Sequence, residues 1–122
     1  MKQKKLILLS LVLLFSTSLL ASGMDDVLVA LSKSNAQMIT NNFDDQVELN
    51  IVELGRANAK QEADNLLIQF YTLNTVKKFA LTHRGCQDNA EFAIGTLTTL
   101  KTTYRLYVLV KNNKIIQLRI EP

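Results

Sequence analysis

The chain has 122 residues, which is room for one domain. Its formal charge of +3 arises near the start, because three of the 14 Lys and Arg residues and none of the 11 Asp and Glu residues precede position 24. The rest of the chain is therefore neutral, which argues against charge-driven binding to nucleic acid or to an anionic membrane. The single cysteine, Cys86, excludes an intramolecular disulfide.

The start of the chain has the layout of a cleavable secretory signal. Basic residues precede an apolar run and two small residues: Lys2, Lys4, Lys5, Leu6–Leu20, Ala21 and Gly23. The run is shorter than the roughly 20 residues that cross a bilayer, and Met24 stands where a lipid anchor requires Cys. We expect a signal peptide at 1–23, one domain at 24–122, and a periplasmic or secreted mature protein without a membrane anchor.

Two helical segments follow. Val27, Leu28 and Leu31 have helical spacing, which predicts a helix over Asp25–Ser34. The side chains of Ser34 and Asn35 compete for backbone hydrogen bonds, and Asn caps a helix start well. We therefore expect a break there and a second helix over Ala36–Asn42, which Phe43 closes.

A strand comes next, because apolar residues alternate at Val47, Leu49 and Ile51. We expect a loop over Gly55–Asn58.

The best helix in the chain is predicted over Ala59–Leu73. Asn58 and Gln61 have the spacing of a capping box at its start. Its apolar residues form a stripe of period 3.6: Ala63, Leu66, Leu67, Phe70 and Tyr71.

Four strands are expected in the second half of the chain. The first, Thr75–His83, places Phe79, Leu81 and His83 on one face, and a turn-rich break follows over Gly85–Asn89. The other three strands are Glu91–Thr99, Thr102–Lys111 and Lys114–Glu121.

The last two strands should form a tight hairpin. Asn112 and Asn113 suit a type I′ turn, because Asn tolerates positive φ. Counting from this turn pairs Lys111 with Lys114, Leu109 with Ile116, Tyr107 with Leu118 and Arg105 with Ile120. Arg119 would then lie opposite Leu106, on the other face from Arg105, so the two arginines would form no common anion clamp. The middle strand is apolar on both faces, which predicts a central strand covered on both sides.

Helices followed by mainly antiparallel strands indicate an α+β fold. This order resembles the nuclear transport factor 2-like fold, also called cystatin-like α+β, in which a curved sheet forms a cone around a helix. The chain also resembles a family of small exported proteins of unknown function from Bacteroidetes. The matching segments are Ser34–Ala36, Phe43–Leu49, His83–Gly85, Ile94–Leu97, Tyr104–Tyr107 and Leu118–Glu121. The resemblance implies the fold and the compartment, but no activity.

Enzymes of the wider superfamily use a carboxylate or His base and a Tyr donor inside the cone, and one fold hosts many functions. His83, the only histidine, and Asp44 are the candidate bases here. The alternatives are a hydrogen-bonded structural histidine at a strand end and, for Asp44 and Asp45, side chains that bond nearby backbone amides in a turn. Cys86 follows His83 by three residues, yet no third orienting residue is identifiable, so an unpaired thiol or an intermolecular disulfide is the alternative to a nucleophile.

Aromatic and basic residues are the candidates for a ligand pocket: Tyr71, Phe79, Tyr104, Arg105 and Tyr107. Strand tyrosines also serve as packing residues, and Arg105 can be a solvated residue or a partner of a glutamate. No metal-binding spacing is present, and we expect neither a metal nor a cofactor.

The sequence thus favours an exported noncatalytic module that binds a small ligand or a protein, in the cone or on the sheet. The alternatives are an isomerase- or lyase-like enzyme that uses His83 or Asp44 with a tyrosine, and a structural homodimer.

Overall fold

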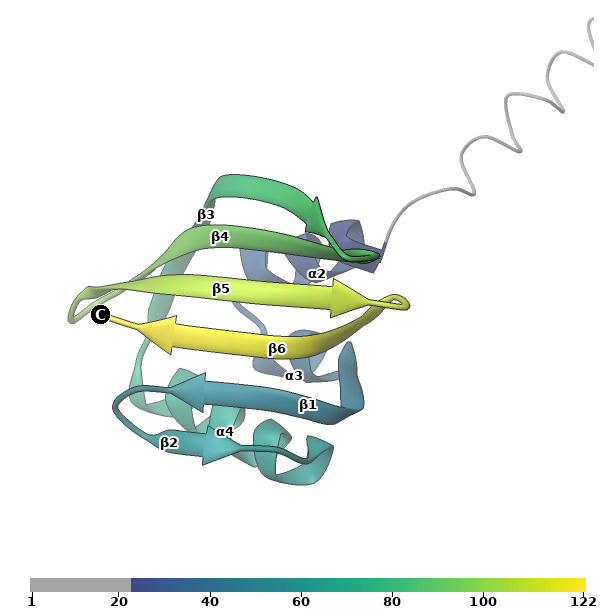
Figure 1. The fold of residues 1–122 in the computed structure, drawn as a ribbon. Helices are drawn as coiled ribbons and strands as arrows, with labels where there is room; N and C mark the ends of the chain where they lie inside the picture. The colour runs from purple at the N-terminus through teal and green to yellow at the C-terminus, as the bar shows by residue number, and fades with distance from the viewer. Residues whose placement is uncertain (1–22) are drawn as a thin grey trace, which may run out of the picture.

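The computed structural model describes residues 23–122, which form one α+β domain (Figure 1). The elements, in chain order, are α2 (Gly23–Ser32), α3 (Ala36–Thr40), β1 (Phe43–Ile51), β2 (Gly55–Ala57), α4 (Lys60–Leu73), β3 (Val76–Gln87), β4 (Ala90–Thr99), β5 (Thr103–Lys111) and β6 (Lys114–Glu121). The signal predicted over 1–23 lies, except for Gly23, outside the described residues. No helix among residues 23–122 is long and apolar enough to cross a membrane.

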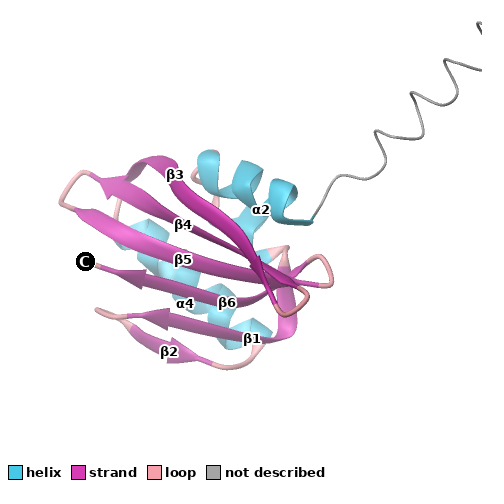
Figure 2. Cartoon of the chain, turned by 45° about the horizontal axis from the view of Figure 1, so that its top comes forward, coloured by secondary structure: helices cyan, strands magenta, loops and turns pink. Residues whose placement is uncertain are grey.

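The six strands form a single curved sheet in the order β2-β1-β6-β5-β4-β3. Only β1 and β6 run parallel; the other neighbours are antiparallel. The helices lie behind the sheet in Figure 1, and Figure 2 shows them together on one side of it. The α+β cone expected from the sequence is therefore confirmed, with β5 as a central strand. The prediction that this strand is covered on both sides is wrong, because helices cover only one face of the sheet (Figure 1 and Figure 2).

The core fills the space between α4 and the sheet. Ala63, Leu67 and Phe70 of the predicted stripe are fully buried, and Leu66 and Tyr71 are partly buried. They meet the inward side chains of the strands, among them the predicted alternation of β1: Val47, Leu49, Ile51, Leu97, Leu106 and Leu118. The period-3.6 and period-2 patterns of the sequence both identify the face that is buried.

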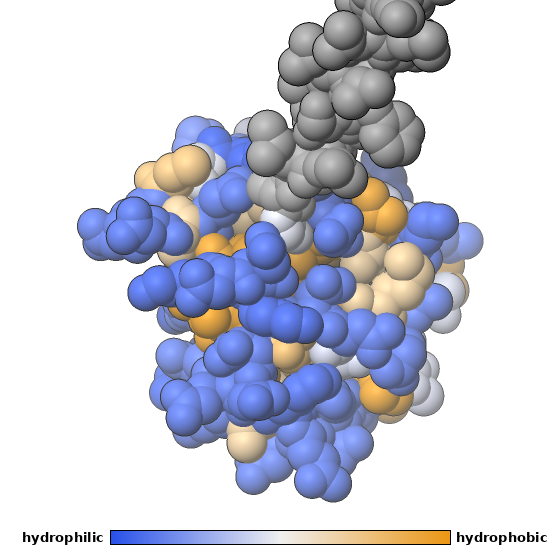
Figure 3. Space-filling view, turned by 90° about the vertical axis from the view of Figure 1, so that its right-hand side faces the viewer, coloured by the Kyte–Doolittle hydropathy of each residue, from blue (hydrophilic) through white to orange (hydrophobic). Residues whose placement is uncertain are grey.

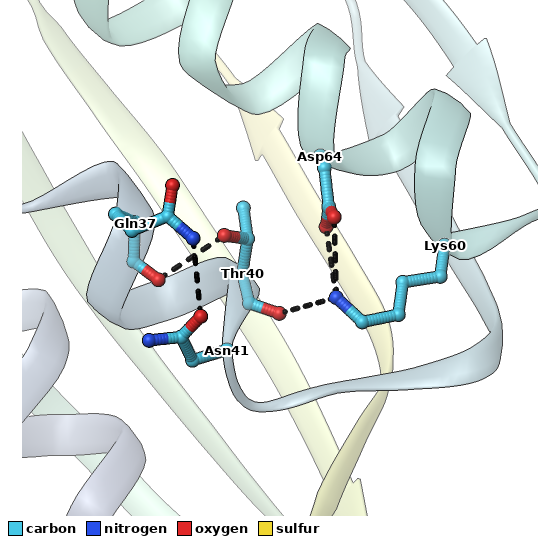
Figure 4. Close-up of polar contacts among 5 residues, drawn as sticks. All are labelled: Gln37, Thr40, Asn41, Lys60 and Asp64. Carbon is cyan, nitrogen blue, oxygen red and sulfur yellow. Dashed lines mark hydrogen bonds and ion pairs between the residues drawn. The ribbon is translucent and has the colours of Figure 1, made fainter.

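One of the two predicted helix caps is present. The Asn35 side chain accepts a hydrogen bond from the Met38 amide (3.2 Å) at the start of α3. The prediction of a capping box at Asn58 is wrong, because α4 begins after Ala59 with no side-chain cap. Lys60 instead links α4 to α3, since its Nζ donates to the Thr40 carbonyl (3.1 Å) and pairs with Asp64 (3.1 Å) (Figure 4).

In three places the structure has a strand where the sequence did not predict one. Gly55–Ala57 is a short strand that pairs with β1 rather than a loop, and Phe43 begins β1 rather than closing the second helix. Strand β3 continues through the predicted break as far as Gln87, because its backbone finds partners along β4. The two-residue turn Asn112-Asn113 is confirmed, with φ of 52° and 64°.

Two of the four register shifts in the sheet decide which way the candidate site residues face. In β3 the pairing with β4 shifts between Leu81 and His83, and in β6 the pairing with β5 shifts at Ile116. Each shift inserts one extra residue on one strand, which is a β-bulge. Because side chains alternate along a strand, every residue beyond a bulge changes face relative to strict alternation.

Candidate functional site

The side of the sheet without helices, which we call the open face, carries a strip of partly exposed apolar side chains. The apolar strip consists of Phe92 and Ile94 on β4, Tyr107 and Leu109 on β5, and Ile116 on β6. Phe92 pairs with Leu109 and Ile94 with Tyr107 across the two strands, so the strip is continuous. Aromatic residues within a polar surround are typical of interaction surfaces.

Three rings lie together on this face. The centroids of His83 and Phe92 are 5.6 Å apart, and those of Phe92 and Tyr107 are 6.3 Å apart with an interplanar angle of 22°. The Phe92 ring covers Gly85, where an added Cβ would lie 2.8 Å from two ring carbons. Glycine at this position therefore lets the ring extend flat over β3.

A hollow of about 310 Å³ lies on the open face, lined by residues at the β3–β4 and β5–β6 ends. Both turns lie at the same end of the sheet (Figure 1). We call this hollow the turn-end hollow. Its lining combines apolar and polar side chains: Ala90, Tyr107, Leu109, Ile116, Gln87, Asp88, Lys111 and Gln117. Figure 3, which looks onto this end of the molecule, shows hydrophobic surface between protruding hydrophilic side chains. The volume of the turn-end hollow lies at the lower end of the range for small-molecule sites.

The interior of the cone is filled by side chains. Phe70 is fully buried and makes edge-to-face contacts with Tyr71 and Tyr104, at centroid distances of 5.8 and 5.2 Å. The Tyr104 hydroxyl donates to a Glu53 carboxylate oxygen (3.0 Å) at the rim. Burial, and secondly this hydrogen bond, raise the pKa of Tyr104. The Tyr71 hydroxyl is buried without a hydrogen-bond partner, and burial raises its pKa strongly.

His83 lies on the open face, so the prediction that it shares a face with Phe79 and Leu81 is wrong. Leu81 pairs with Gly95 and His83 with the adjacent Ile94, and neighbouring residues of a strand point to opposite faces. The cause is the bulge at Thr82, whose hydroxyl donates to the Ile94 carbonyl (2.9 Å).

Asp44 lies at the start of β1, where its carboxylate accepts a hydrogen bond from the Gln46 amide (3.3 Å). This is the local turn contact expected of an aspartate at a helix-to-strand junction. The structure brings together His83 and Tyr107, with the Phe92 ring between them, but places Asp44, Tyr71 and Tyr104 elsewhere.

The predicted separation of Arg105 and Arg119 is also wrong. Arg119 pairs with Tyr107, and Arg105 pairs with Glu121, so both arginines lie on the open face. The bulge at Ile116 moves the register by one residue relative to a count from the turn.

The five predicted pocket residues divide between the two sides of the sheet. Tyr71, Phe79 and Tyr104 pack on the core side, whereas Arg105 and Tyr107 lie on the open face, and of the five only Tyr107 lines the turn-end hollow. Sequence reasoning missed Gln87 because β3 was expected to end at His83, and it missed Gln117 because the bulge at Ile116 was not foreseen. Cys86 is an exposed free thiol.

A second, shallower hollow of about 270 Å³ lies between β2 and α4. It is lined by Arg56, Ala57, Glu62, Asn65, Leu66 and Gln69. Across the described part of the chain, no three His, Cys, Asp or Glu side chains gather in a way that could hold a metal ion.

The family model of a domain of unknown function, DUF4783, matches residues 24–121. The chain belongs to this family. A DUF4783 family protein from Bacteroides ovatus is 32% identical to it, with 78% of this chain and 90% of that one covered and a TM-score of 0.69. For the DUF4783 family protein from Bacteroides uniformis the values are 28%, 80%, 94% and 0.70.

More distant structures share the fold. An NTF2-like protein of unknown function from Cytophaga hutchinsonii is 13% identical, with 80% of this chain and 84% of that chain covered and a TM-score of 0.59. The nuclear transport factor 2-like fold inferred from the element order is thus confirmed. None of the curated proteins compared matches the chain.

Proposed function

We propose that this DUF4783 domain is an exported noncatalytic module that binds a small ligand or a protein on the open face of its sheet. One observation carries the proposal: the cone interior is filled around Phe70, whereas the open face presents the apolar strip and the turn-end hollow. Apolar surface that the fold leaves uncovered marks interaction sites when polar residues surround it.

The placement of the titratable residues supports a noncatalytic role. A general base acts within hydrogen-bond reach of the proton it removes, usually inside a closed pocket. His83 and Asp44 lie apart on the surface, and Tyr104 bonds Glu53 rather than either of them. Tyr107 lies on the same face as His83, but the Phe92 ring stands between the two side chains. The isomerase- or lyase-like alternative therefore loses the convergent site on which it depends.

Nuclear magnetic resonance of the ¹⁵N-labelled mature chain tests the proposal, with phenol at millimolar concentration as the probe. We expect phenol to shift backbone amides of the open face, among them Ile94, Tyr107 and Gln117. Shifts confined to Tyr71 and Tyr104 would show that the cone opens to a ligand and would overturn the proposal. Export is tested separately by intact mass: the protein recovered outside the cytoplasm should lack about 23 residues, as the signal pattern predicts.

A structural homodimer is the second candidate, since the apolar strip is continuous over three neighbouring strands. Two sheets that pack face to face bury such strips against each other. Sedimentation velocity of the mature chain decides between the candidates. A monomer at several hundred micromolar removes the homodimer, whereas a dimer that the Leu109→Asp variant dissociates replaces ligand binding as the function of this face.

A further inference from the structure

The β5–β6 hairpin contains a pair of like charges directly beside the turn-end hollow. Lys111 and Lys114 are cross-strand partners that flank the Asn112-Asn113 turn, and both are exposed. Like charges directly opposite each other destabilise a strand pair, so this arrangement costs stability. Neither lysine takes part in any ion pair formed within residues 23–122.

The two lysines project to the open face. The preceding pair, Val110 and Ile115, is buried in the core, and side chains alternate along each strand. Lys111 also lines the hollow itself. Lys111 therefore borders an apolar floor formed by Ala90, Leu109 and Ile116, and Lys114 follows as its cross-strand partner on the side toward the turn.

The rest of the lining restricts the charge of a ligand. The Gln87 and Gln117 amides can donate hydrogen bonds to a carboxylate that the lysines hold. Asp88 belongs to the β3–β4 turn, across β4 from Lys111, and would repel a second negative group. This combination favours a single anionic head on an apolar body.

We infer that the turn-end hollow binds a monocarboxylate whose head lies at Lys111 and Lys114 and whose apolar body covers Leu109 and Ile116. This inference rests on the proposed function and names the ligand chemistry of one part of the open face. The same chemistry has two sources, a free organic acid and the C-terminal residue of a peptide.

The experiment is a titration of the ¹⁵N-labelled mature chain with 3-phenylpropionate, followed by nuclear magnetic resonance. Two control probes are used: 3-phenylpropanol, which lacks the charge, and acetate, which lacks the apolar body. We expect the acid to shift amides around the hollow and to bind more tightly than either control probe. The double variant Lys111→Gln/Lys114→Gln should bind it about five-fold more weakly, as expected for exposed charge contacts. Lys78→Gln removes a lysine that is also exposed but does not line the hollow, and should leave the affinity unchanged.

Equal binding of the acid and the alcohol at the hollow would overturn the carboxylate inference and leave the proposed function standing. Equal loss in Lys78→Gln would also overturn it, because the effect would then be general charge. Shifts around Tyr71 and Tyr104 would overturn both. A third probe separates the two sources of carboxylate: a peptide that ends in a free Phe carboxylate, compared with its amidated form and with 3-phenylpropionate. Tighter binding of the peptide acid assigns the site to chain ends. Tighter binding of 3-phenylpropionate assigns the site to free acids.

Discussion

Gly95 in β4 is a position where a single methyl group should damage the packing of the sheet. An added Cβ would lie 2.5 Å from Cε1 of Phe79 and 2.6 Å from the backbone oxygen of Ala80. The ring could turn away, but the carbonyl belongs to β3, which is hydrogen-bonded to β4 along its length. Gly95→Ala therefore requires the two strands to move apart.

The cost can be estimated from the contacts. Overpacking typically costs about 1–3 kcal/mol, and we expect about 3 kcal/mol for Gly95→Ala because one of the close atoms is backbone. For a domain of about 100 residues this corresponds to a fall in Tm of at least about 10 °C. Thermal unfolding followed by circular dichroism, together with urea titration, measures both quantities.

Gly85→Ala is the matched control. Its Cβ would also meet a ring, that of Phe92 at 2.8 Å, but the contact lies on the open face with no backbone atom nearby. Because alanine also restricts the unfolded chain, which offsets roughly 0.4–1 kcal/mol, we expect a net loss below about 1 kcal/mol. Equal losses in the two variants would refute the assignment of Gly95 to the packed side of the sheet and Gly85 to the open side.

Three further predictions concern capping and the buried tyrosines. Asn35→Ala should lower the free energy of unfolding by about 1 kcal/mol because it removes the cap of α3. Asn58→Ala removes no cap bond and should change the free energy of unfolding by less than about 0.5 kcal/mol. Equal effects of the two variants in urea titrations would contradict this prediction. Tyr71→Phe should stabilise the domain by about 1 kcal/mol, because it removes a buried hydroxyl without a partner, and a loss of stability would show that the hydroxyl is bonded after all. Burial raises the pKa of Tyr104 above its ordinary value of 10.0, so the folded chain favours the neutral side chain more than the unfolded chain does. The resulting contribution to the free energy of unfolding is fully present below pH 10 and is lost as the pH rises further. Urea titrations above pH 10 should show this decline, and it should be weaker in Tyr104→Phe; an unchanged slope would rule out Tyr104 as the source.

The local periodicity of the sequence determined most of the elements. Val47, Leu49 and Ile51 alternate because one face of β1 is buried, and the stripe around Leu67 and Phe70 repeats every 3.6 residues because one face of α4 is buried. The Asn112-Asn113 turn follows from the tolerance of asparagine for positive φ, which is also a local property.

The candidate site depended on contacts between distant segments. A strand shows its alternation in the sequence, but a bulge at Thr82 or Ile116 forms only when the neighbouring strand holds both flanking segments in register. One inserted residue turns every side chain beyond it to the other face, which is why His83 and Arg119 lie opposite to where strict alternation placed them. The parallel pairing of β1 with β6 likewise joins segments far apart in the chain. The sequence by itself therefore determined which segments are strands and helices, and the tertiary structure decided which residues share the open face.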